Sequence, residues 1–391
     1  MMMNGISSVP FCSTEIRFLT SAALQEHLLS LRLENIVLLM TENGEKRWNL
    51  SPFVSRLRES AKSFVRICNI PSNPTSEDIA DAVNHIGSSP VDIILAIGGG
   101  SCIDLAKGIS AFYHQSGDVA SESILLDIQN KSYLSHAGVD IIAVPTTAGT
   151  GSEVTQWATV WDKVGKKKYS LDCPQLKPKA AYIVPEYTLP LSAEQTLSTG
   201  LDALSHAVEA YWSRFTTPLV QDIAYRAVEL IVSHLRAVIE SPDDLYLREK
   251  ICRASLLAGL AFSQTRTTAC HAISYPLTMH YGIPHGFAVA LSLTGVAEIN
   301  RGHFPNDSEL FGLFDMCGGI HGWLDKTSRN IIKLDLINFN FEDLSIIAEE
   351  ACASGRMSNN PCEISSDDVL KILNDSYNNL NANDIVRGWE V

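Results

Sequence analysis

Short apolar runs separated by stretches with helical periodicity constrain the fold of this chain more than any other sequence feature. The runs cover residues 35–40, 65–70, 91–97 and 139–144. They are mostly apolar rather than alternating, which is typical of strands buried on both faces of a parallel sheet. The helical stretches between them would then cover those faces. Residues 1–188 are therefore predicted to form an α/β domain with a parallel sheet.

The sequence changes character after Pro190. Strand patterns become rare, and long helical runs rich in alanine and leucine take their place, at residues 192–213, 218–240, 246–263 and 287–300. Ser192 and Gln195 fit a capping box at the start of the first run. We expect residues 189–391 to form an all-α C-terminal domain, with residues 185–190 as the hinge.

Two glycine-rich segments follow directly after predicted strands. Gly-Gly-Gly-Ser occupies residues 98–101, and Pro-Thr-Thr-Ala-Gly-Thr-Gly-Ser occupies residues 145–152. Glycine lets backbone N–H groups approach a pyrophosphate, and a helix N-terminus adds partial positive charge. The first segment lacks the Gly-x-Gly-x-x-Gly spacing, so a tight turn needing positive φ is an alternative. Two such loops can line one crevice of a nucleotide-binding domain.

One carboxylate and three imidazoles form a candidate metal site. Asp202 and His206 are four residues apart, which places them on one helix face, and His271 and His285 follow in a segment punctuated by glycine and proline. Imidazole suits Fe, Zn, Cu and Ni. The alternative is that the Asp-x-x-x-His pair is an ordinary hydrogen-bonded helix face.

Composition excludes several classes of protein. The chain has 391 residues, of which 46% are hydrophobic and 19% charged, with a net charge of −14. This charge argues against a nucleic-acid or anionic-membrane partner, and no apolar run is long enough to span a membrane. Nine scattered cysteines without a Cys-x-x-Cys pair indicate reduced thiols, and we expect a cytoplasmic protein.

These motifs together resemble those of the iron-containing (group III) alcohol dehydrogenases. The matching segments are Gly200-x-Asp202-Ala-x-x-His206-Ala-x-Glu, Gly-Gly-Gly-Ser-x-x-Asp-x-x-Lys and Pro-Thr-Thr-Ala-Gly-Thr-Gly-Ser-Glu. The resemblance extends from about residue 35 to the Asn-Pro at 360–361. It implies a dehydroquinate synthase-like architecture with a metal-binding helical domain. It also implies Fe(II), less often Zn(II), on Asp202, His206, His271 and His285, and we expect a homodimer.

The resemblance further implies a set of cofactor contacts. Gly99, Gly100, Ser101 and Asp104 would lie by the pyrophosphate, Thr146 and Thr147 on the adenosine side, and Asn73, Thr155 and Lys168 elsewhere along NADH or NADPH. A solvated charged turn is the alternative for the Lys166–Lys168 run. The ribose contact falls on Glu42, which favours NADH, or on Thr41, which leaves NADPH open.

The resemblance implies reversible hydride transfer between a nicotinamide and a small aldehyde or primary alcohol, with the metal as Lewis acid. Many relatives carry a histidine where this chain has Tyr275. Tyr275 could donate the proton, or His280 could, unless His280 is a surface histidine.

The segment around Arg266, Thr267 and Thr268 resembles the phosphonoacetaldehyde reductases within this family. Those enzymes form 2-hydroxyethylphosphonate, and Arg266 would suit a phosphonate. The two threonines would lie on the metal-facing side of a helix. Alternatively, Arg266 pairs with a core carboxylate and another short aldehyde, such as a 4-hydroxybutyrate-type semialdehyde, is the substrate. A metal-dependent lyase like dehydroquinate synthase would use a glutamate and two histidines instead.

Overall fold

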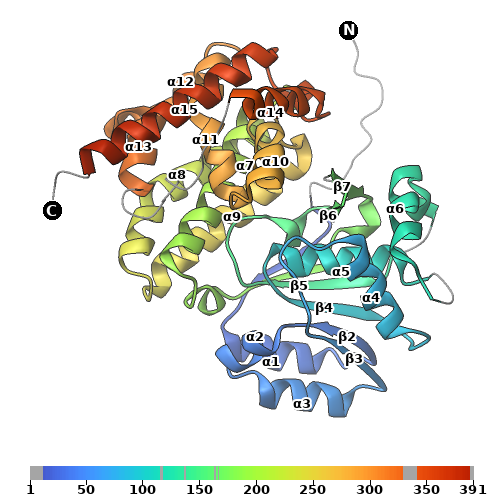
Figure 1. The fold of residues 1–391 in the computed structure, drawn as a ribbon. Coiled ribbons are helices and arrows are strands. Elements are labelled where there is room, and N and C mark those ends of the chain that lie inside the picture. The colour runs from blue at the N-terminus through green and yellow to red at the C-terminus, as the bar shows by residue number, and fades with distance from the viewer. Residues whose placement is uncertain are drawn as a thin grey trace, which may run out of the picture.

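A computed structural model describes residues 12–114, 118–135, 138–162, 164–165, 167–328 and 341–387. The N-terminal part contains a six-stranded sheet, and the C-terminal part is helical (Figure 1). The predicted fold class is confirmed. The last sheet strand ends at Ile183 and the first long helix begins at Ala193, so the expected boundary at residue 188 falls in the connection between them.

The sheet is parallel throughout, with strand order β1-β8-β5-β4-β2-β3. Its strands are β1 (Glu15–Phe18), β2 (Asn35–Leu39), β3 (Ser63–Ile67), β4 (Ile93–Gly98), β5 (Asp140–Pro145) and β8 (Ala180–Ile183). Strands β4 and β5 end side by side, since Gly98 is paired with Pro145 and Thr146 N donates to Gly98 O at 3.0 Å. The two glycine loops therefore leave the same edge of the sheet together.

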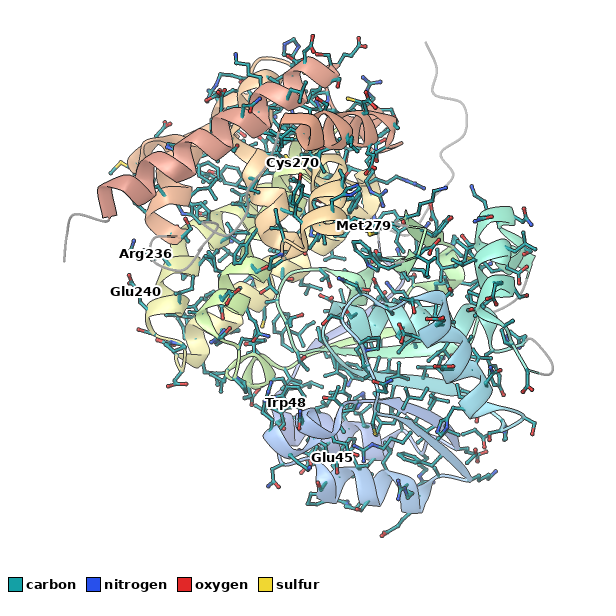
Figure 2. All side chains as sticks on the ribbon, viewed as in Figure 1. Glu45, Trp48, Arg236, Glu240, Cys270 and Met279 are labelled. Carbon is teal, nitrogen blue, oxygen red and sulfur yellow. The ribbon has the colours of Figure 1, made fainter. Side chains whose placement is uncertain are left out.

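Helices cover both faces of the sheet (Figure 1). Ile36 and Leu38 pack with α1 (Ser21–Ser30) and α3 (Ser51–Ser60). The alternating neighbours Val37 and Leu39 pack on the other face with α4 (Ser76–Ile86), α5 (Gly100–Phe112) and α6 (Ser121–Asn130). This alternation is why β2 is apolar without interruption. Beside the first face, Trp48, which follows α2 (Glu42–Arg47), packs on Tyr187 (Figure 2).

The helical part is built around α7 (Ala193–Trp212), which begins with the predicted capping box of Ser192 and Gln195. Helices α8 (Pro218–Glu240), α9 (Leu245–Thr265), α10 (Ala269–Tyr281) and α11 (His285–Asn300) pack around it, followed by α12 (Asp307–Gly312), α13 (Gly319–Ser328), α14 (Phe341–Ala353) and α15 (Ser366–Arg387). Cys270 is buried in this part, whereas Arg236 and Glu240 pair on its exterior (Figure 2). Among the described residues, no helix combines the length and apolar character that crossing a bilayer requires.

An antiparallel hairpin lies outside the main sheet and was absent from the sequence-based prediction. It consists of β6 (Trp157–Asp162) and β7 (Lys167–Asp172). Asp104 of α5 holds it, because its carboxylate accepts hydrogen bonds from Thr159 N at 3.0 Å and from Ser152 Oγ at 2.6 Å. The hairpin is thereby fixed to the second glycine loop.

Lys107 of α5 makes the same connection from inside the core. Its side chain is fully buried, and Nζ donates to Ser152 O at 2.7 Å, Ser152 Oγ at 2.9 Å and Trp157 O at 2.7 Å. Burial lowers the pKa of Lys107 to about 8, although Asp104 opposes this shift. The ammonium group is therefore a structural tie between helix, loop and hairpin.

Replacing Lys107 with methionine should lower the free energy of unfolding by about 2 kcal/mol or more, since it leaves buried carbonyl oxygens without donors. Denaturant unfolding of the two proteins measures the change. Lys62→Met is the matched control, because Lys62 pairs with Glu34 on the surface. This substitution should lower the free energy of unfolding by less than about 1 kcal/mol. Equal destabilisation by the two substitutions would contradict this structural role.

Candidate active site

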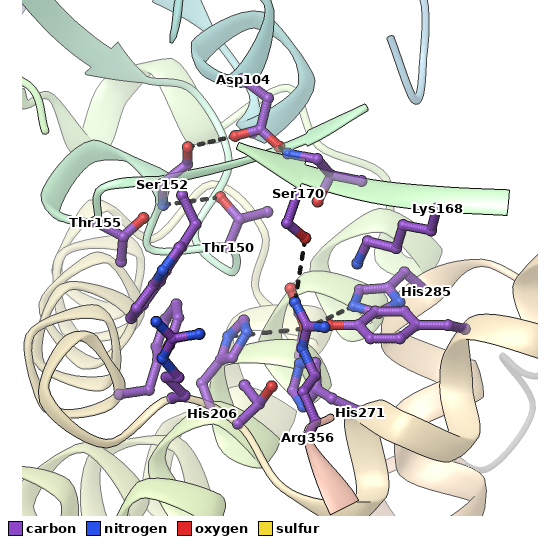
Figure 3. A pocket seen from close by; sticks show the side chains of 18 of the residues that line it. Asp104, Thr150, Ser152, Thr155, Lys168, Ser170, His206, His271, His285 and Arg356 are labelled. Atoms are coloured by element: carbon purple, nitrogen blue, oxygen red, sulfur yellow. Dashed lines mark hydrogen bonds and ion pairs between the residues drawn. The ribbon is translucent and has the colours of Figure 1, made fainter. Parts of the chain in front are cut away.

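A cavity of about 850 Å³ lies between the carboxyl edge of the sheet and the helical part, under the β6–β7 hairpin (Figure 3). Both parts of the chain contribute to its wall. Its lining includes Asn73, Gly100, Ser101, Asp104, Thr150, Ser152, Thr155, Trp157, Trp161, Lys168, Ser170, Asp172, Asp202, His206, Phe262, Arg266, Thr267, His271, Tyr275, His285, Arg356 and Asn359.

Donor atoms suited to a metal converge in this cavity. Those of Asp202, His271 and His285 all lie within 4.8 Å of one another. Asp202 Oδ1 is 3.5 Å from His271 Nε2 and 3.7 Å from His285 Nε2. His206, the fourth predicted ligand, lies beside this cluster, with its Nδ1 3.8 Å from the same oxygen and 3.3 Å from Gly149 O.

The chemistry of these groups fits a divalent cation. Asp202 Oδ1, His271 Nε2 and His285 Nδ1 are buried atoms without a hydrogen-bond partner in the described part of the chain. Burial lowers the pKa of His206 to about 4 and of His285 to about 3, which leaves both imidazoles neutral. Burial alone would raise the pKa of Asp202, but the surrounding imidazoles lower it below its usual value. A carboxylate and neutral imidazoles are the forms that bind metals.

Glu209 orients His271 toward the cluster. It follows Asp202 by two turns of α7 and is fully buried, and its carboxylate contacts His271 Nδ1. It also accepts hydrogen bonds from Thr268 N at 3.1 Å, Thr268 Oγ1 at 2.8 Å and His271 N at 3.2 Å. A carboxylate behind a ligand histidine fixes the ring and raises its basicity.

Close packing against neighbouring side chains explains why residues 98–100 of the first glycine loop are glycines. Gly98, Gly99 and Gly100 are absent from the positive-φ positions of the described chain, so the turn alternative is wrong for this loop. A Cβ on Gly100 would lie 2.5 Å from Thr150 Cγ2, and one on Gly99 would lie 3.3 Å from Thr147. The two glycine loops therefore touch, and the N-terminus of α5 opens into the cavity.

The predicted cofactor residues fall into two groups. Six line the cavity, namely Asn73, Gly100, Ser101, Asp104, Thr155 and Lys168, whereas Glu42, Gly99, Thr146 and Thr147 lie outside its lining. Asp104 has both carboxylate oxygens bound to protein donors, so it organises the loops rather than facing a pyrophosphate. Thr41 Oγ1 caps α2 by accepting from Gly44 N at 3.0 Å. Glu42 therefore has the freer side chain beyond β2.

The fold places the two candidate proton donors, Tyr275 and His280, in different environments. Tyr275 lines the cavity and stacks on His285, with ring centroids 5.7 Å apart. Burial raises the pKa of its phenol, which therefore stays protonated at neutral pH. His280 lies outside the cavity lining, with Nε2 3.0 Å from Glu350, so its assignment as catalytic acid is corrected.

The predicted substrate residues also need correction. Arg266 lines the cavity, but it pairs with Asp172 at 2.6 Å and its side chain is 58% exposed. Helix α10 begins at Ala269, so Thr267 and Thr268 precede the helix instead of lying on its face. Thr268 is buried and its Oγ1 accepts from Trp212 Nε1 at 2.9 Å as well as bonding Glu209. Of these three residues, Thr267 lines the cavity and takes part in no ion pair with the described residues.

Sequence reasoning missed Arg356 and the role of Glu209. Glu209 could have been found, because its spacing from Asp202 returns it to the same helix face. Arg356 lies in the connection between α14 and α15, and only the tertiary fold brings it into the cavity. No local pattern distinguishes it from a surface arginine.

Comparisons with known proteins agree with this geometry. Residues 14–185 match the family model for iron-containing alcohol dehydrogenases, and residues 196–319 match the model for the C-terminal part of Fe-containing alcohol dehydrogenases. The chain is 27% identical to an NAD-dependent methanol dehydrogenase of Bacillus methanolicus, covering 81% of this chain and 85% of that one. It is 33% identical to a phosphonoacetaldehyde reductase of Streptomyces viridochromogenes, covering 64% of each.

Among solved structures, the chain resembles a sulfoacetaldehyde reductase from Bifidobacterium kashiwanohense in complex with NAD+. The TM-score is 0.82 at 26% identity, covering 93% of this chain and 97% of that chain. The similarity thus extends over both parts of the fold.

Substituting glutamine for Glu209 should weaken metal binding about 10- to 100-fold, because His271 loses the carboxylate that orients it. Elemental analysis after dialysis against graded chelator concentrations measures this. Glu298→Gln, the same change at an exposed position of α11, is the control. Unchanged metal retention in the Glu209 variant would rule out the orienting role.

Proposed function

The chain belongs to the iron-containing alcohol dehydrogenase family, and on that basis we propose that it reduces phosphonoacetaldehyde to 2-hydroxyethylphosphonate with NADH. The proposed metal ligands are Asp202, His206, His271 and His285. The proposal depends mainly on one observation, the convergence of the Asp202, His271 and His285 donor atoms in a cavity that Gly100 and Ser101 also line. This convergence supports a metal site and a cofactor loop that face the same cavity.

When bound, Fe(II) would polarise the carbonyl oxygen and the nicotinamide would carry the hydride. The N-terminus of α5 provides backbone N–H groups and partial positive charge for a pyrophosphate. Trp157, Trp161 and Phe262 give the cavity wall aromatic surface. Tyr275 is the proposed proton donor, because its phenol stays protonated beside His285.

Two similarities support an aldehyde with an anionic tail. One relative is named a phosphonoacetaldehyde reductase and one structural neighbour a sulfoacetaldehyde reductase. Both names describe a two-carbon aldehyde that carries a tetrahedral oxyanion. Lys168 and Arg356 give the cavity positive charge in a chain whose net charge is −14. Such local charge is what a dianionic substrate requires.

The substrate proposal is tested by comparing kcat/KM for phosphonoacetaldehyde, acetaldehyde and succinic semialdehyde in the metal-loaded enzyme. We expect phosphonoacetaldehyde to be preferred by about 100-fold, the contribution of a well-placed charged contact. Removing the metal with a chelator should abolish NADH oxidation, and added Fe(II) should restore it. A preference for either other aldehyde would refute the substrate, and full activity without metal would refute the mechanism.

Glu42 is the proposed ribose contact, and its carboxylate would repel a 2′-phosphate. Glu42→Gly should therefore raise the affinity for NADPH relative to NADH by about tenfold, as measured by fluorescence titration of each cofactor. Thr41→Ala serves as the comparison, since Thr41 caps α2. If only the Thr41 variant changes the ratio, the ribose contact is misassigned.

A further inference from the structure

Two cationic side chains meet on one aromatic ring inside the cavity. Lys168 Nζ of β7 lies 3.3 Å from the ring centroid of Tyr275, and Arg356 Cζ lies 4.8 Å from the same centroid. The Tyr275 ring in turn stacks on His285, one of the proposed metal ligands. Figure 3 shows Lys168 and Arg356 converging next to His285. Positive charge is thus concentrated directly beside the candidate metal cluster.

Neither basic side chain forms an ion pair with a carboxylate of the described chain. Within the described residues, no ion pair involves Lys168 or Arg356, and the side chain of Arg356 makes its one hydrogen bond, at 3.4 Å, to the neutral Ser170 Oγ. Burial and then the charge on Arg356 lower the pKa of Lys168 well below its usual value, although the carboxylates of Asp104 and Asp202 oppose this shift. Arg266, by contrast, is neutralised by Asp172. Two neighbouring basic side chains without an ion-pair partner are more favourable when a ligand supplies negative charge.

The segment that carries Arg356 is firmly held at its far end. Asn359 Nδ2 donates to Thr267 O at 2.9 Å, and the buried Asn360 exchanges amide hydrogen bonds with Asn300 at 3.0 and 2.7 Å. On the near side, Arg356 N donates to Ser354 Oγ at 3.4 Å. The anchor at Asn359 and Asn360 and the hydrogen bond to Ser170 Oγ restrict the positions of the guanidinium group. A pre-positioned guanidinium loses little entropy when it binds an oxyanion.

We infer that Arg356, with Lys168, forms the subsite that binds the oxyanion tail of the substrate, and that Arg356 determines specificity for that tail. The inference builds on the proposed function, since it places the aldehyde end at the metal cluster beside His285. The planar guanidinium can bind two oxygens of a tetrahedral oxyanion at once. A bound anion favours the protonated form of Lys168, so Arg356 and Lys168 together match the dianionic phosphonate better than the monoanionic sulfonate.

Substituting Arg356 gives the clearer test, because Lys168 is also a proposed cofactor contact. Arg356→Gln should lower kcat/KM for phosphonoacetaldehyde by about 100-fold or more, mainly through KM, as expected for a lost charge-assisted contact. Turnover of acetaldehyde, which has no anionic tail, should stay within about threefold. Arg356→Lys should recover part of the phosphonate activity, and sulfoacetaldehyde should be affected less than phosphonoacetaldehyde.

Arg266→Gln is the matched comparison, since it removes the other arginine of the cavity wall. It should change phosphonate kcat/KM by less than about threefold. A large loss in this variant with none in Arg356→Gln would overturn the assignment. So would a parallel loss of acetaldehyde turnover in both Arg356 variants, which would indicate a structural role. Metal content and NADH affinity of each variant verify that the fold is intact.

Binding of ethylphosphonate, an unreactive analogue, separates this inference from the proposed function. Calorimetry on the metal-loaded enzyme with NADH should detect binding that weakens about tenfold or more in Arg356→Gln. If the wild-type enzyme prefers another aldehyde but still binds ethylphosphonate through Arg356, the proposed substrate is wrong and the subsite stands. Absence of ethylphosphonate binding to the wild-type enzyme would refute the subsite.

Discussion

The imidazole of His271 lies between two buried carboxylates of α7, and the arrangement of the site depends on this contact. Its Nδ1 faces Glu209 and its Nε2 faces Asp202. Two negative charges cannot be buried without compensation, and removing one partner of such a pair costs several kcal/mol. The contact also fixes α10 against α7, so that Tyr275, one turn after His271, faces the cavity.

A second set of contacts joins the cofactor side to the metal side. Asp104 and Lys107 project from α5 and bind the second glycine loop and the hairpin. Lys168 lies on that hairpin and reaches Tyr275 of the helical part. The hairpin therefore connects the glycine loop, where the cofactor is proposed to bind, to the helical part that carries the proposed metal ligands.

Local patterns predicted the parts of this structure that depend on short stretches of sequence. The continuous apolar character of residues 35–40 and 91–97 identified β2 and β4, and the four-residue spacing of Asp202 and His206 placed both on one face of α7. The other features of the structure depend on tertiary contacts. A charged turn was the alternative for the run around Lys168, but Lys168 lies on a strand, because β7 pairs with β6, and it lines the cavity.

The two arginines of the cavity wall, Arg266 and Arg356, show the same limit of prediction from local sequence. The resemblance of its segment and the chemistry of arginine favour Arg266 as the substrate residue, yet Asp172, from the distant hairpin, pairs with it. Arg356 lies far from the proposed ligands in sequence but near them in space. Neither the partner of Arg266 nor the exposure of Arg356 to the cavity is encoded in local periodicity, since both depend on how the hairpin and the C-terminal segment pack.

The segment that carries Arg356 contains none of the proposed metal ligands and none of the proposed cofactor contacts. This segment connects α14 to α15 and lines the cavity. Hydrogen bonds of the Asn359 and Asn360 side chains hold it in place. The proposed specificity residue Arg356 and the proposed metal ligands thus lie on separate stretches of polypeptide. In evolutionary terms, a protein built this way can acquire a new substrate through changes in a few residues of one connection, while the reaction itself is conserved.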